Sequence, residues 1–138
     1  MRKTLWAGRI MMALGVIHLV LMTGLAYKHV PGWFGLELWD PKADPTSIQP
    51  SLGAFWSSYG SFSVPLLLLG AFTVHQGRRG VPVPRFVGWG VGLWALGGAY
   101  LLEPTPFVLA LIPAILILKD RSPREDQATA APNTSPTK

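Results

Sequence analysis

His18 is the residue of this sequence whose type and position most directly suggest chemistry. It lies within 10–27, a stretch without Asp, Glu, Lys or Arg. If this stretch is a membrane helix, His18 lies roughly 20 Å from its cytoplasmic end, near mid-membrane. An ionisable group at that depth is a functional candidate, either for a ligand or for a proton. A neutral histidine can also serve as hydrogen-bonding glue between helices, so both interpretations stay open.

Further polar side chains are predicted in the same region. Ser61 and Trp94 reach a depth similar to that of His18 on other apolar stretches, and a buried indole N–H needs an acceptor. Tyr59 and Glu103 lie closer to the outer surface. Together these residues predict a ligand-binding site in the outer half of a helical bundle, formed by His18, Tyr59, Ser61, Trp94 and Glu103.

Metal and cofactor sites are not expected. The chain has no Cys, which excludes disulfides and thiolate chemistry. His75 is predicted some 15–20 Å from the depth of His18, and His29 is also too far along the helix axis to share a metal with it. No carboxylate lies within a predicted membrane helix, and no nucleophile–base pair or phosphate-binding motif is present. These features favour a non-enzymatic protein without cofactor or metal.

Four apolar, charge-free stretches must position these residues. They predict helices at about 5–27, 54–76, 86–102 and 104–118, the last being short for a bilayer at roughly 22 Å. Only 14% of the residues are charged, against roughly 25% in soluble domains. The fold expected is therefore all-α, a four-transmembrane-helix bundle formed by 1–118.

The charges between the stretches alternate in sign and predict the orientation. Lys and Arg are retained in cytoplasmic segments, which places both termini in the cytoplasm of a multi-pass protein of the cell membrane. The net charge of +5 does not indicate nucleic-acid binding, because the basic residues cluster at predicted membrane ends. The expected cytoplasmic side holds Arg2, Lys3, Arg9, Arg78, Arg79, Arg85, Lys119, Arg121, Arg124 and Lys138. The expected outer side holds Lys28, Lys42, Glu37, Asp40, Asp44 and Glu103.

Two alternatives to this topology stay open. Residues 1–26 resemble a cleavable signal peptide, although Arg9 interrupts the start of the apolar stretch. The stretches 86–102 and 104–118 could also form a re-entrant hairpin, which would leave the basic tail outside. The segment 119–138, rich in Pro, Thr, Ala and Ser, is expected to be a disordered cytoplasmic tail.

Small residues and a proline suggest how the helices pack. Gly88, Gly92, Ala95 and Ala99 lie on one stripe of the third helix, where they allow either packing within the bundle or a homodimer seam. Pro65 is predicted to kink the second helix and to free the carbonyl of Ser61.

The long connection between the first two helices is aromatic. Five large apolar side chains occur within 33–39. This outer loop is expected to lie along the membrane surface, as an anchor or as a lid over a site between the helices.

The chain resembles a family of small bacterial four-helix membrane proteins of unknown function. The resemblance covers about 8–118, and it implies four helices but no activity. It rests on Gly8-Arg9-Ile10, Gly15-Val16-Ile17-His18, Ala54-Phe55-Trp56, Leu66 to Gly70, Pro84-Arg85-Phe86-Val87-Gly88-Trp89, Glu103-Pro104, Phe107 and Pro113.

Two functions are therefore expected. The first is a partner subunit or modulator in the bilayer, which self-associates or binds another membrane protein through the Gly88/Gly92 face or the outer loop. The second is a lipid or small-molecule binding or transport protein with its site near His18.

Overall fold

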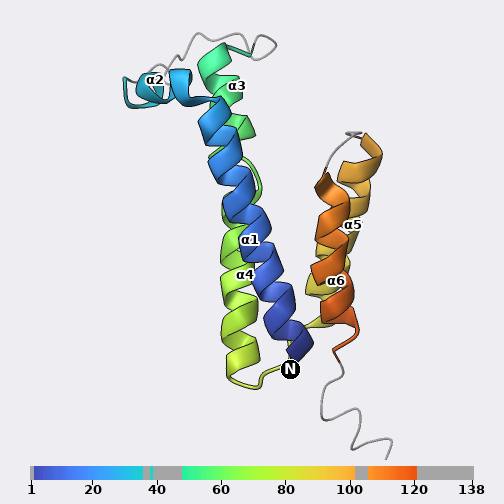
Figure 1. Ribbon diagram of the computed structural model, residues 1–138. Helices are drawn as coiled ribbons and strands as arrows, with labels where there is room; N and C mark the ends of the chain where they lie inside the picture. Colours follow the sequence, from blue (N-terminus) through green and yellow to red (C-terminus); the bar gives the residue numbers. More distant parts are fainter. Residues whose placement is uncertain (1, 36–37, 39–47, 102–105, 121–138) are drawn as a thin grey trace, which may run out of the picture. The chain divides into compact units, whose positions relative to one another are not determined.

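The computed structural model describes residues 2–35, 38, 48–101 and 106–120, and within these ranges the secondary structure is helical with no strand (Figure 1). This confirms the all-α class. Contacts divide the chain into two compact units, Gly8–Phe72 and Met1–Ala7 with Thr73–Lys138. The helices are α1 (Arg2–Leu25), η1 (Tyr27–His29), α2 (Val30–Phe34), α3 (Pro50–Ser57), α4 (Ser63–Arg78), α5 (Arg85–Leu101), η2 (Pro106–Ala110) and α6 (Leu111–Leu118).

Within the unit Gly8–Phe72, α1 and α4 pack antiparallel at very short range. A Cβ added at Gly70 would lie 2.7 Å from the carbonyl oxygen of Gly8, and one added at Gly15 would lie 2.8 Å from that of Ser63. Only glycine permits this approach of the two backbones, which allows dispersion contacts and Cα–H···O contacts along the seam. The small residues that fix this pair are therefore on α1 and α4.

The stretch 54–76, expected as one helix, is two helices. α3 ends at Ser57, and α4 begins at Ser63. Pro65 is therefore in the first turn of α4, where its missing N–H has no helical partner to lose, so it does not kink a continuous helix. The carbonyl of Phe62 accepts the N–H of Leu66 at 2.9 Å.

In the other unit, α5 packs antiparallel on η2 and α6. A Cβ at Gly88 would lie 2.9 Å from the Leu118 side chain, and one at Gly98 would lie 2.7 Å from the Phe107 ring. A Cβ added at Gly92 would lie 3.5 Å from the Cβ of Ala114, and Ala95 is fully buried. The stretch 104–118 is not a single α-helix in its described part, because Pro106–Ala110 is a 3₁₀ segment.

The ends of the first and last helices meet in this same unit. The N–H of Thr4 donates to the Asp120 carboxylate at 2.9 Å, and the Thr4 hydroxyl bonds to the same oxygen. Lys3 Nζ donates to the carbonyl oxygen of Lys119 at 3.2 Å. Lys119 and Asp120, placed in the tail by the sequence, thus belong to the folded part, whereas 121–138 lies outside the described residues.

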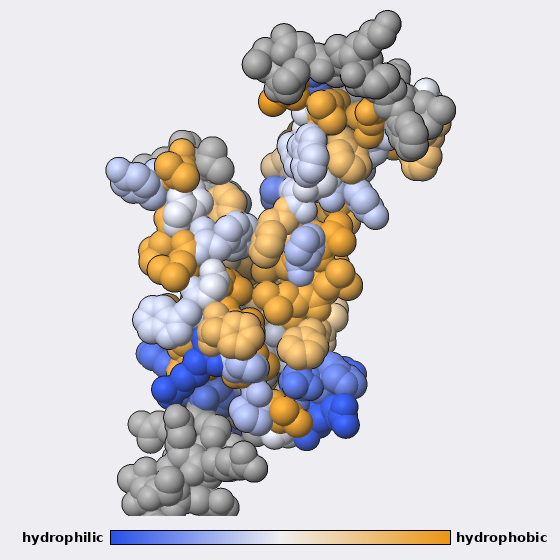
Figure 2. Space-filling model, turned by 180° about the vertical axis from the view of Figure 1, so that it is seen from behind, coloured by the Kyte–Doolittle hydropathy of each residue, from blue (hydrophilic) through white to orange (hydrophobic). Residues whose placement is uncertain are grey.

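One described helix, α1, is long and apolar enough to cross a membrane. It has 24 residues, and its most apolar window has a mean hydropathy of 1.8. α4 and α5 have 16 and 17 residues. Figure 2 shows apolar side chains over much of the helix surfaces.

Candidate functional site

The break between α3 and α4 gathers four serines, Ser57, Ser58, Ser61 and Ser63. Its backbone leaves the helical conformation at Ser58, which has φ −110° and ψ −95° and is fully buried. The Ser58 hydroxyl donates to the carbonyl oxygen of Ala54 at 2.6 Å, and that of Ser61 donates to the carbonyl oxygen of Ser58 at 2.6 Å. Ser61 and Ser63 share a further hydroxyl–hydroxyl bond. These hydroxyls thus give the carbonyls of Ala54 and Ser58 a second donor beside the backbone N–H groups of Ser58 and Ser61.

His18 joins α1 to this break. Its Nε2 lies 3.2 Å from the carbonyl oxygen of Ser57, the last residue of α3. A carbonyl only accepts, so Nε2 carries the proton in this bond and Nδ1 is the acceptor of a neutral ring. This contact is hydrogen bonding between helices, one of the two interpretations of His18.

The other predicted site residues are spread over the structure. Tyr59 is exposed and contacts the Phe55 ring at 5.9 Å between centroids. Trp94 is in the other unit, where it packs edge-on against Phe107 at 4.9 Å. Glu103 lies outside the described residues. The structure therefore brings His18 and Ser61 to one helix break, and the five-residue ligand site stays a prediction.

An elbow at the end of α1 positions a second candidate site, which the sequence did not predict. The chain leaves α1 at Leu25, makes the 3₁₀ turn η1 and enters α2, which projects sideways from α1 (Figure 1). Trp33 fixes α2 to α3, because its indole N–H donates to the carbonyl oxygen of Ser51 at 3.0 Å. Its ring also meets Phe55 edge-on at 5.8 Å. In the loop predicted to be aromatic, Trp33 thus packs against α3, whereas the side chain of Phe34 is 84% exposed.

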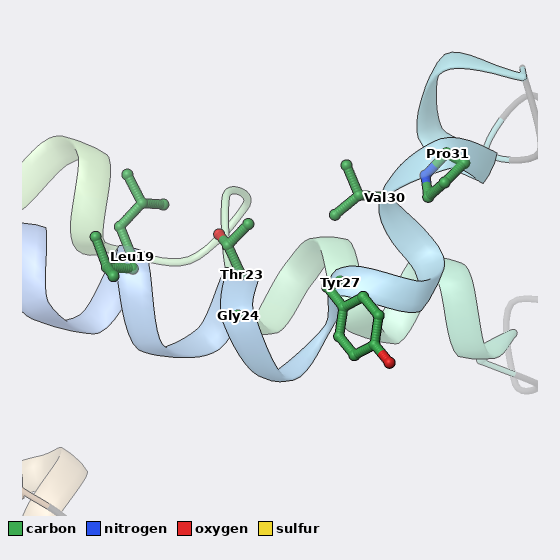
Figure 3. Close-up of a pocket in the computed structure, with 7 residues that line it drawn as sticks. Leu19, Thr23, Gly24, Tyr27, Val30 and Pro31 are labelled. Carbon is green, nitrogen blue, oxygen red and sulfur yellow. The ribbon is translucent and has the colours of Figure 1, made fainter.

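The inside of this elbow is a shallow apolar pocket of about 650 Å³, widely open to its surroundings. We call it the elbow pocket (Figure 3). Volumes of roughly 300–1,000 Å³ are typical of small-molecule sites. Thr23 and Val30 project to one side of the ribbon, from α1 and from the start of α2, while the ring of Tyr27 projects to the other side in this view. Its lining is Leu19, Val20, Thr23, Gly24, Tyr27, Val30 and Pro31.

The elbow pocket and His18 lie on different faces of α1. At roughly 100° per residue, Val20 and Thr23 are about 140–160° around the helix axis from His18. His18 points to α3, and none of the five predicted ligand residues lines the pocket. The sequence signal that could have indicated the elbow is Pro31 at the start of a helix, directly after the apolar run of α1.

Lys28 supplies a positive charge at the elbow. Lys28 Nζ lies 5.9 Å from the centroid of the Tyr27 ring, a cation–π arrangement at the rim of the pocket. The segment 2–35 contains no Asp or Glu. Among the described residues, no group of three or more His, Cys, Asp or Glu could hold a metal ion.

Comparison with known proteins places the chain in a family. No curated protein and no solved structure matches it. A family profile matches residues 2–124, nearly the whole described chain. The chain belongs to the family of unknown function DUF6463.

Proposed function

We propose that this protein is a four-span integral membrane protein, with both termini cytoplasmic, that binds a lipid-like amphiphile in the elbow pocket. The elbow pocket is the observation that carries the binding role. It is an open, apolar recess at the end of α1, and its lining contains two polar side chains, Thr23 and Tyr27.

The surface of α1 supports a lipid environment. Only 22% of its most apolar window is buried within the protein, whereas the core helix of a soluble protein is mostly buried. Side chains such as Val20, Leu21 and Leu25 are 58–79% exposed. Water would penalise such a surface, and lipid would not.

Helix directions and hydrogen bonds support an even number of crossings. α1 runs antiparallel to α4, and α5 runs antiparallel to α6. The Thr4–Asp120 bonds join the start of α1 to the residues just after α6, so these two helix ends lie together. α4 and α5 are roughly 24 and 26 Å long, a little short of a hydrocarbon core of about 30 Å. Local thinning or the added length of α3 makes up this difference.

Cysteine labelling tests the topology sharply, because the natural chain has no Cys. In intact cells, a membrane-impermeant maleimide should label Lys28→Cys and Pro106→Cys but not Arg79→Cys or Lys119→Cys. All four positions are exposed, so all should react after permeabilisation. Equal labelling of Lys28→Cys and Arg79→Cys in intact cells would contradict the four-span topology.

Filling the elbow pocket tests the binding role. Thr23→Trp should reduce the phospholipid retained by the protein by more than about tenfold, a loss of roughly 1.4 kcal/mol, because the indole occupies the space of the ligand. The measurement is native mass spectrometry of the full chain released gently from its membrane. Ile17→Trp is the matched control, since it adds the same ring to α1 at an exposed position outside the pocket. A wild-type protein without bound lipid, or equal retention by the two variants, contradicts the proposal.

The partner-subunit role receives less support. It needs an open Gly88/Gly92 face, and α6 occupies this face through Leu118 and Ala114. A tryptophan anchor of the outer loop, Trp33, is likewise engaged with α3. The elbow pocket has no such occupant among the described residues, so ligand binding is the function that the geometry supports best.

A further inference from the structure

We infer that the elbow pocket selects an anionic phospholipid, with an acyl chain along α1 and the phosphate at Lys28. This inference rests on the proposed function and names the class of its ligand.

The shape of the pocket fits an acyl chain. Leu19, Val20 and Thr23 continue along α1 toward Tyr27, a length of roughly 12 Å at 1.5 Å per residue. Val30 closes the corner from α2. These walls offer an apolar chain many dispersion contacts but give a soluble phosphate compound almost no polar partner. The ligand must therefore be largely hydrocarbon.

Apart from the Thr23 hydroxyl, the polar groups of the elbow lie at the Tyr27 end of this path. Tyr27 marks the end of the pocket, and the Lys28 ammonium lies 5.9 Å above its ring. A tyrosine next to a lysine at the end of a membrane helix marks the level of the lipid headgroups. The ligand is thus oriented, with its tail toward Leu19 and its headgroup toward Lys28.

The Lys28 ammonium favours a headgroup with a net negative charge. No carboxylate occurs from residue 2 to 35, so neither α1 nor α2 supplies an anion next to this ammonium. Lys28 is exposed and can turn its ammonium to a phosphate while its stem stays on Tyr27. A net negative headgroup gains from this cation, and a zwitterionic one carries its own ammonium and gains less.

The experiment is lipid competition with the full chain. The protein is reconstituted in vesicles of equal amounts of phosphatidylglycerol and phosphatidylcholine, released gently and measured by native mass spectrometry. Wild type should retain phosphatidylglycerol in preference to phosphatidylcholine. Lys28→Gln should lower this preference about fivefold, the factor that corresponds to roughly 1 kcal/mol for one lysine near an anionic surface. It should leave the retention of phosphatidylcholine unchanged.

Arg79→Gln is the matched control. It also removes one exposed positive charge, but at the residue just after α4 and outside the elbow pocket. An equal loss of preference in this variant would assign the effect to general membrane electrostatics and overturn the inference. Lipid retention without a preference for phosphatidylglycerol would overturn it as well, while leaving the proposed function intact. Absence of any retained lipid would instead contradict the proposed function.

Discussion

Replacing Gly70 with alanine should lower the free energy of unfolding by about 1–3 kcal/mol, the usual cost of overpacking a tight interface. The new Cβ would lie 2.7 Å from the carbonyl oxygen of Gly8 and 2.8 Å from the backbone nitrogen of Met12. These are backbone atoms of α1, so no side-chain rotation relieves the clash. The two helices must move apart along the seam and lose their contacts. Denaturant unfolding in mixed micelles, followed by circular dichroism, measures the change.

Gly24→Ala is the matched control for this prediction. Gly24 also lies in a helix of the unit Gly8–Phe72, but a Cβ there meets nothing within 4 Å. The added methyl should leave the free energy of unfolding unchanged or raise it by up to about 1 kcal/mol through helix propensity. If both variants unfold at the same denaturant concentration, close packing of α1 on α4 does not stabilise the fold.

The helical content of this chain could be predicted because long apolar stretches without charged residues indicate helices. α5 spans Arg85–Leu101, against a predicted 86–102. The interruption at 58–62 could not be predicted in the same way. Pro65 fits both a kinked helix interior and a first turn, and only the serine hydrogen bonds around Ser58 decide between the two.

The seam and the pocket depend on contacts that local periodicity does not report. The stripe of small residues at Gly88 was visible in the sequence, but Gly15 and Gly70 form the closest backbone approach only because α4 returns along α1. The elbow pocket depends on Trp33 reaching Ser51, across a segment of which most lies outside the described residues. The predicted site near His18 followed from depth along helices, which does not give the face on which a side chain lies.

Replacing Asp120 with asparagine should weaken the connection between the two chain ends and cost about 1–2 kcal/mol of stability. The Asp120 carboxylate accepts hydrogen bonds from the N–H and the hydroxyl of Thr4, which lies in the first turn of α1. The positive end of the helix dipole also stabilises a negative charge at this position. Asparagine keeps an acceptor oxygen but removes the charge. Thr4→Val removes the hydroxyl instead. If both variants act on the same bonds, the double variant should cost less than the sum of the single ones.

The pH dependence of this effect identifies the charge as its source. Burial raises the pKa of Asp120. The interactions that lower this pKa, among them the hydrogen bonds from Thr4, outweigh burial, so the pKa lies below its ordinary value. A carboxylate with a lowered pKa contributes stability above the unfolded value of about 3.9, and this contribution is lost as the pH falls through the folded value. The difference in unfolding free energy between wild type and Asp120→Asn should therefore be constant near neutral pH and shrink in acid below about pH 4. A difference that stayed constant into strong acid would assign the loss to the shape of the new amide and not to the charge that joins α1 to the end of α6.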